Sequence, residues 1–228
     1  MTGRLGRYRD IAWFVAKYGR AEFVTRALNG ADTSPAEPGD AETFARDLES
    51  LGPTFVKLGQ ILSTRVDLLP PAYLDALARL QDQVEPFPYE DVERIVREEL
   101  GVRVSHAFVE FDRLPIAAAS LGQVHRAVLR GGREVAVKVQ RPGIHEQVEQ
   151  DLSAFHEIAA VIDRIGAAPN MDAARVVDEF KRTLMSELDY REEARNLVPI
   201  AHQLRDFENI VVPLPVDDFT TARVLTMD

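Results

Sequence analysis

The first pattern along the chain is a series of segments in which apolar residues recur every three or four positions. This period predicts amphipathic helices, and it is present in 4–28, 54–66, 72–84 and 89–101. Pro53 suits the first turn of the second helix, and Pro70-Pro71 ends that helix and begins the next. We therefore expect the first hundred residues to be mainly helical.

After Gly101 the pattern changes to short runs rich in Val and Ala. Residues 125–130 and 133–140 are joined by Gly131-Gly132, and this two-residue connection predicts an antiparallel hairpin with a tight turn. Side chains alternate between the two faces of a strand. We therefore expect a buried face formed by Val135, Val137 and Val139, and an opposite face that presents Ala136, Lys138 and Gln140.

Two further helices are predicted at 144–165 and 172–207, followed by an extended segment at 221–227. The order of helices, hairpin, helix pair and strand predicts an α+β fold rather than a doubly wound one. The sequence suggests three parts: a basic helix with a Gly- and Pro-containing linker, a helical extension, and a domain that contains the sheet. The second and third parts are divided where the helical pattern changes to short runs of Val and Ala. The expected boundaries of the three parts are 1–40, 41–104 and 105–228.

Composition narrows the functional classes. The chain has 228 residues, of which 46% are hydrophobic and 28% charged, as is usual for a globular protein. The net charge of −10 argues against nucleic-acid binding, which needs clustered Lys and Arg. There is no cysteine, so disulfides, thiolate metal sites and a cysteine nucleophile are excluded. The five histidines lack metal-ligand spacing, and we expect no metal site.

Positive charge is concentrated at the start of the chain. Residues 1–30 hold six Lys/Arg and two acidic residues, a net charge of +4. A basic amphipathic helix over 4–28 either packs on its own domain, which is the commoner case, or lies on an anionic membrane surface. No apolar run is long enough to predict a transmembrane helix.

The most informative chemistry lies in residues 117–124, AAASLGQV. This segment has the length of the nucleotide-covering loop G-x-G-x-x-G-x-V of protein kinases. Ala117 and Ala119 occupy the places of the first two glycines, whereas Gly122 and Val124 match the last glycine and the valine. Lys138 follows on the second strand of the hairpin, as in a kinase N-lobe. The alternative is that the small residues form a packing turn.

Taken together, these motifs resemble the UbiB/ADCK family of atypical kinase-like proteins, which support ubiquinone and other isoprenoid-lipid metabolism. The resemblance covers about residues 42–228 and depends on four motifs in the family's order. They are Lys57-Leu58-Gly59-Gln60, Ala117-Ala118-Ala119-Ser120, VAVKVQRPGI around Lys138, and ELDYREEARN with Glu187 and Asp189. The resemblance implies a protein-kinase-like N-lobe with a family-specific helical extension.

The resemblance also implies that the protein binds ATP or ADP. The residues expected to contact the nucleotide are Ala117, Ala118, Ala119, Ser120, Gly122, Val124, Ala136, Lys138 and Met227. The 228 residues contain no H-R-D-x-x-x-x-N loop and no D-F-G motif, which supply the general base and the Mg²⁺ ligands of kinases. We therefore expect an N-lobe that ends near the hinge at Asp228 and catalyses no turnover alone, with Mg²⁺ bound only when a C-lobe is present.

A catalytic pair and a regulatory group follow from the same resemblance. Glu193 would hold the ammonium group of Lys138, although the adjacent Glu192 is the alternative if the helix register differs. Glu187 would face Lys57. The regulatory residues Lys57, Gly59, Gln60, Glu187 and Asp189 would restrict access of a peptide substrate. The pattern alone, without the resemblance, favours another interpretation, in which the acidic residues of 187–193 form an ordinary solvated helix face.

The resulting functional hypothesis is an ATP-binding atypical kinase or ATPase of ubiquinone or isoprenoid-lipid metabolism. The first alternative is a non-catalytic nucleotide-binding scaffold for membrane lipid-biosynthesis enzymes, and the second is a helical interaction bundle without a nucleotide. The expected partners are an adenine nucleotide, proteins of lipid or quinone biosynthesis, and a membrane surface contacted through residues 4–28. We expect a cytoplasmic protein, with peripheral attachment to the inner membrane if that helix binds lipid.

Overall fold

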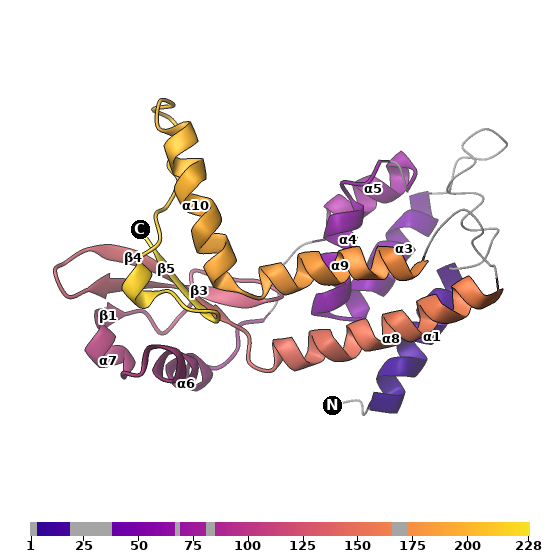
Figure 1. Cartoon of the computed structure of the whole chain (residues 1–228), viewed down its shortest axis with the longest axis horizontal. Helices are drawn as coiled ribbons and strands as arrows, with labels where there is room; N and C mark the ends of the chain where they lie inside the picture. The colour runs from indigo at the N-terminus through magenta and orange to yellow at the C-terminus, as the bar shows by residue number, and fades with distance from the viewer. Residues whose placement is uncertain (1–3, 19–37, 67–68, 81–84, 166–172) are drawn as a thin grey trace. The chain divides into compact units, whose positions relative to one another are not determined.

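The computed structural model describes residues 4–18, 38–66, 69–80, 85–165 and 173–228 (Figure 1). The chain divides into two compact units, one comprising residues 1–82 and 146–182, and the other residues 83–145 and 183–228. Two helices, α8 (Ile144–Ile165) and α9 (Ala173–Glu187), continue from one unit into the other. This division differs from the boundary expected at residue 104, because α6 (Tyr89–Leu100) belongs to the unit that contains the sheet.

The first unit is helical and has an aromatic core. It contains α1 (Arg4–Tyr18), α3 (Pro38–Ser50), α4 (Pro53–Leu62), α5 (Pro71–Ala78) and most of α8. The rings of Phe14 and Phe44 both lie 4.8 Å from the ring of Tyr18, measured between centroids. Helix α4 ends four residues before the predicted position. The Ser63 and Thr64 hydroxyls donate hydrogen bonds to main-chain carbonyls of the preceding turn, which stabilises the helix end.

The apolar face of α1 lies inside this core. Ile11, Phe14 and Tyr18 are buried, and the Arg7 guanidinium donates two hydrogen bonds, of 2.5 and 2.6 Å, to the buried carboxylate of Asp151. The structure thus supports packing of this helix on its own domain. Membrane attachment through residues 4–28 stays a prediction, and residues 19–28 lie outside the described part of the chain. Among the described helices, none combines the length and the apolar character needed to cross a bilayer.

The second unit is built around an antiparallel sheet. Its strands are β1 (Phe108–Phe111), β2 (Ala117–Ala118), β3 (Gly122–Leu129), β4 (Glu134–Gln140) and β5 (Val224–Met227). The order is β1-β3-β4-β5, and β2 pairs with the start of β3. The predicted hairpin is confirmed as β3–β4. Its turn uses Gly131 and Gly132 at φ 149° and 82°, where a side chain would be strained.

Helices lie on both sides of this sheet (Figure 1). Helices α6 and α7 (Val104–Ala107) lie on one side, and α10 (Tyr190–Leu204) rises from the other. The buried Val92, Ile95 and Val96 of α6 pack in the same core cluster as the valines of β4. A short 3-10 helix, η1 (Asp217–Phe219), precedes β5. The α+β fold predicted from the sequence is confirmed.

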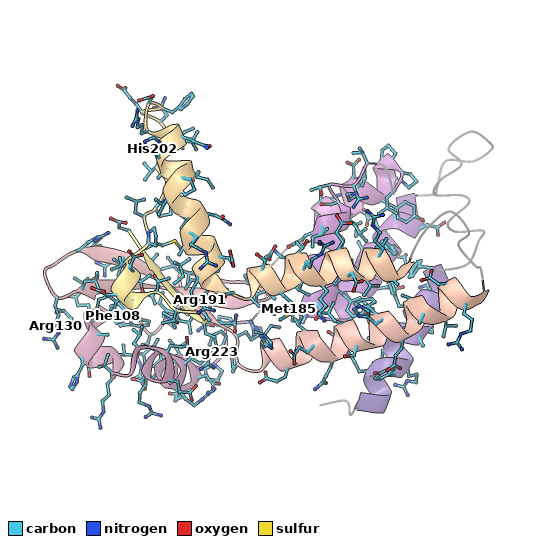
Figure 2. All side chains as sticks on the ribbon, in the orientation of Figure 1. Phe108, Arg130, Met185, Arg191, His202 and Arg223 are labelled. Atoms are coloured by element: carbon cyan, nitrogen blue, oxygen red, sulfur yellow. The ribbon has the colours of Figure 1, made fainter. Side chains whose placement is uncertain are left out.

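The single helix predicted over 172–207 is wrong, because the structure contains two helices there. Helix α9 ends at Glu187, and α10 begins at Tyr190 after an extended Asp189 with φ −110° and ψ 96°. The Asp189 side chain accepts a hydrogen bond from the Arg191 main-chain N–H at 3.1 Å and thus caps α10. Figure 2 labels Arg191 where α10 starts beside the sheet and His202 near its far end.

Candidate functional site

One face of the sheet collects most of the residues predicted to contact a nucleotide. In the ladder, Ala117 lies opposite Val124, and Val124 lies opposite Lys138. Directly opposed residues of antiparallel strands share a face. The next row is formed by Arg126, Ala136 and Met227. The strand register therefore places five predicted residues on one face: Ala117, Val124, Ala136, Lys138 and Met227.

On this face Lys138 forms an ion pair with α10. Its ammonium nitrogen lies 2.7 Å from Oε2 of Glu193, and the two side chains are 27% and 39% exposed. The adjacent Glu192 instead pairs with Arg195 along the helix. The structure thus brings together the two residues expected to form the catalytic pair. A pair this exposed adds little to folding stability, so its main effect is to fix the position of the Lys138 charge.

Tyr190 is a third member of this cluster, and sequence reasoning missed it. Its side chain is 1% exposed and packs with Ala194 and Leu225. The Lys138 ammonium lies 4.7 Å from the centre of the Tyr190 ring, within range of a cation–π interaction. The available signal was an aromatic residue directly after the cap, inside the otherwise charged sequence DYREE. A lone ring among charges at a helix start favours a buried anchor.

The Ala-rich segment is shorter as a loop than its sequence suggested. Ala117 and Ala118 form β2, so only residues 119–121 connect the two strands. The turn closes on itself, because the Ala119 N–H donates to the Gly122 carbonyl at 2.7 Å. The Ser120 side chain is buried, although the resemblance implied that it contacts the nucleotide.

Gly122 is needed for close packing rather than for backbone freedom. A Cβ atom added there would lie 2.6 Å from the main-chain oxygen of Val139 and 2.5 Å from the Tyr190 hydroxyl. Its φ lies outside the left-handed region, unlike the φ angles of the hairpin glycines. The one glycine that the chain retains from the kinase loop pattern is thus a point where β3 packs closely against β4 and α10.

Asp189 has a structural partner of its own. The Arg191 guanidinium donates hydrogen bonds of 2.7 and 2.8 Å to its two carboxylate oxygens. These bonds lower the pKa of Asp189 below its usual value, against the smaller opposing effect of partial burial. Asp189 is thus the cap that precedes α10 and not part of a helix continuous with Glu193, as the predicted helix over 172–207 required.

The K-x-G-Q residues lie on α4 in the first unit. Lys57 and Gln60 are half-buried, and Gly59 is buried. A Cβ on Gly59 would collide with Leu80 Cδ1 and would lie 3.2 Å from Leu77 Cδ2. The neighbours that approach this glycine are therefore leucine side chains. Glu187 ends α9 in the second unit, and its pairing with Lys57 stays a prediction.

The described residues contain no cluster of three or more His, Cys, Asp or Glu side chains suited to a metal ion. The site of the second unit thus consists of an ordered cation, a carboxylate from a capped helix, and a sheet face that carries small and apolar side chains together with Arg126. The Lys138 ammonium offers a positive charge for an anion on this face. Comparison with similar proteins identifies the family of the chain.

The family model described as the ABC1 atypical kinase-like domain matches residues 79–228. The chain is 45% identical over 193 residues to the chloroplastic protein ACTIVITY OF BC1 COMPLEX KINASE 8 of Arabidopsis thaliana, covering 82% of this chain and 25% of that protein. It is 44% identical over 186 residues to the probable protein kinase UbiB of Marinobacter nauticus, covering 79% of this chain and 33% of that protein. The chain thus spans a quarter to a third of the length of these two relatives.

A solved structure supports the same assignment. The Mycobacterium tuberculosis protein Rv3197, in its complex with erythromycin, is 33% identical, with a TM-score of 0.58. The match covers 84% of this chain and 48% of that one. The kinase-like fold class and the resemblance to UbiB/ADCK proteins are thereby confirmed. Because the family model spans well over half of the sequence, the chain belongs to the ABC1 atypical kinase-like family.

Proposed function

We propose that the chain binds an adenine nucleotide, ATP or ADP, on one face of the sheet in the second unit. This open face is the one that carries Ala117, Val124, Ala136, Lys138 and Met227. The observation that supports this most is the 2.7 Å contact between Lys138 and Glu193, because it holds one ammonium group in a defined place beside the small and apolar side chains of that face. In kinases the equivalent lysine contacts nucleotide phosphates while a helix glutamate orients it. The residues present are suited to the same task.

In this proposal each residue has a separate role. Ala136 and Met227 face each other across β4 and β5, and their half-buried side chains would contact the flat base. Lys138 would contact the phosphates, with its ammonium oriented by Glu193 and by the ring of Tyr190. Residues 117–121 would lie beside the phosphates. The bound nucleotide would supply the transferable phosphoryl group, and the chain's residues would bind and orient it.

We further propose that the protein acts in ubiquinone or isoprenoid-lipid metabolism, as an atypical kinase or ATPase, together with lipid- or quinone-biosynthesis proteins. Support comes from the UbiB names of several relatives, including those of Marinobacter nauticus, Pseudomonas putida and Vibrio cholerae. These relatives are longer than the present chain, so the reaction and the partners belong to the proposal.

Nucleotide titration of purified variants tests the binding site. We expect Lys138→Met or Glu193→Gln to weaken ADP and ATP binding by about 1–3 kcal/mol, as for loss of a charge-assisted contact. Two control variants should bind like the unmodified chain. Glu192→Gln changes the adjacent carboxylate, which pairs with Arg195, and Lys181→Met removes an exposed lysine of α9.

Two results would contradict the proposal. If the unmodified chain binds neither nucleotide, the site has another ligand. If Glu192→Gln weakens binding more than Glu193→Gln does, the carboxylate that orients Lys138 in the bound state has been assigned wrongly. Unfolding midpoints of all four variants should be measured in urea, because a pair as exposed as Lys138–Glu193 is expected to change stability by less than about 1 kcal/mol.

A further inference from the structure

Arg141, the residue after β4, donates hydrogen bonds to the main-chain carbonyls of the short loop 119–121. Its Nε donates to the Ser120 oxygen at 3.2 Å, and Nη2 donates to the Ala119 oxygen at 3.4 Å. Its own main-chain N–H donates to the Leu121 oxygen at 2.9 Å. Three consecutive carbonyls of the loop are thus bound by one residue.

The guanidinium group of Arg141 is itself fixed by a second segment. It lies 5.4 Å from the centre of the Phe87 ring, and Nη2 also donates to the Glu85 oxygen at 3.0 Å. Phe87 is buried, and both its N–H and its carbonyl are paired with the side chain of the buried Gln123, at 2.9 and 3.2 Å. Arg141 therefore contacts the loop from a position held by stacking and by neighbouring hydrogen bonds.

This arrangement determines which way the loop amides point. In a planar trans peptide the C=O and the following N–H point in opposite directions. When the carbonyls of Ala119 and Ser120 are directed at Arg141, the N–H groups of Ser120 and Leu121 are directed away from it. Orientation of loop amides is what binds or repels phosphate oxygens in a nucleotide loop. Arginine stays protonated in proteins, so these hydrogen bonds from Arg141 are independent of pH in the physiological range.

We infer that Arg141 is a positioning residue that sets the conformation of loop 119–121, and through it the strength of nucleotide binding. The second half of this inference rests on the proposed nucleotide function, whereas the first half concerns the free protein. Removing Arg141 leaves the loop with several conformations, of which only a fraction has the binding arrangement. The apparent dissociation constant then rises in inverse proportion to that fraction.

The decisive experiment compares three variants of the full 228-residue chain by amide hydrogen exchange and by titration with ADP and ATP. Arg141→Met removes the charge and the donors, and Arg141→Lys keeps the charge but loses the planar group. Arg130→Met is the matched control, because Arg130 also donates to a main-chain oxygen, that of His106, at 2.9 Å. Figure 2 labels Arg130 at the hairpin end of the sheet.

For Arg141→Met we expect faster exchange at the Ala119 amide, which donates to the Gly122 carbonyl across the loop, with unchanged exchange in the centres of β3 and β4. Nucleotide binding should weaken about tenfold, as when the competent fraction falls to about a tenth. Arg141→Lys should give a smaller change in the same direction, and it serves as the test variant if Arg141→Met does not fold. Arg130→Met should match the unmodified chain in both measurements.

The outcomes separate this inference from the proposed function. If the unmodified chain binds neither nucleotide, the proposed function fails, and loop exchange alone decides the role of Arg141. If loop exchange is unchanged in a folded Arg141→Met, or if exchange rises equally throughout the sheet, Arg141 does not position the loop. If binding occurs and Arg141→Met leaves it unchanged, the loop conformation does not govern nucleotide affinity.

Discussion

The two faces of strand β4 differ although their residues alternate along seven positions. Val135, Val137 and Val139 are at most 4% exposed and pack beneath α6. Ala136 and Lys138, between them, are half-buried on the face from which α10 rises. The period of two allows one short strand to contribute to the core and to the candidate site together. The core face fixes the register, and the register then fixes the position of the lysine.

Polar residues also occur on the core face, but they are buried and hydrogen-bonded. Gln123 and His125 of β3 are buried, and their side chains are 3.0 Å apart. The His125 Nδ1 lies 2.7 Å from the Asp112 carbonyl, and burial lowers the pKa of the imidazole below its usual value. Neutral, hydrogen-bonded groups are accepted in this core, whereas full charges are confined to the open face.

The same substitution on each face should therefore give very different results. Val137→Lys places an unpaired charge in the core, and we expect it to lower the free energy of unfolding by about 3–5 kcal/mol or to prevent folding. Val128→Lys places the same side chain on the open face, between Glu110 and Glu134 in the ladder. We expect a change of less than about 1 kcal/mol there.

Urea unfolding followed by circular dichroism measures both effects. Equal losses in the two variants would show that the open face is as tightly packed as the core face, and the comparison would be wrong.

A smaller loss of unfolding free energy is expected for a substitution at Gly122, where β3 packs closely against β4 and α10. In Gly122→Ala the new methyl group would collide with the Val139 oxygen and the Tyr190 hydroxyl. Relief requires a shift of the strand or of α10, so we expect a loss of about 1–3 kcal/mol in unfolding free energy. The double variant Gly122→Ala/Tyr190→Phe removes only the hydroxyl, so it should recover part of that loss. Full recovery would show that the backbone of Val139 is not a constraint.

Local sequence features were sufficient to predict the hairpin and the side of the sheet on which Lys138 lies. Gly131-Gly132 and the alternation of valines act over a few residues, so they predicted the turn and the side of Lys138 without tertiary information. The pairing of Lys138 with Glu193 spans 55 residues, and it came from the family resemblance rather than from the pattern.

The missed features depend on contacts that no periodicity encodes. Leu184 and Leu188 are buried at helical spacing up to the end of α9, so the apolar pattern does not mark the break at Asp189. The sequence from Asp189 to Glu192 does fit a capping box, so the start of α10 was detectable. Arg141 binds carbonyls of a distant loop, and a backbone oxygen leaves no trace in the sequence.

The smallest effect is expected at the cap that starts α10, and it tests whether the open face depends on this helix. Asp189→Ala removes the side-chain acceptor for the Arg191 N–H, and we expect a loss of about 1 kcal/mol at pH 7. The pKa of Asp189 is lower in the folded chain than when unfolded, because Arg191 hydrogen-bonds its carboxylate. Its contribution is therefore fully present above the unfolded pKa of about 4 and declines as the pH falls through the lower folded value.

Unfolding free energies of Asp189→Ala and the unmodified chain should thus converge below about pH 4. Asp189→Asn keeps a good cap without a titrating charge, so it should lie close to the unmodified chain at pH 7 and show less pH dependence than that chain. Since α10 also carries Glu193, fraying of its first turn should weaken nucleotide binding more in Asp189→Ala than in Asp189→Asn. A difference between the unmodified chain and Asp189→Ala that stays constant from pH 7 to pH 3 would mean that the carboxylate charge does not stabilise the start of α10.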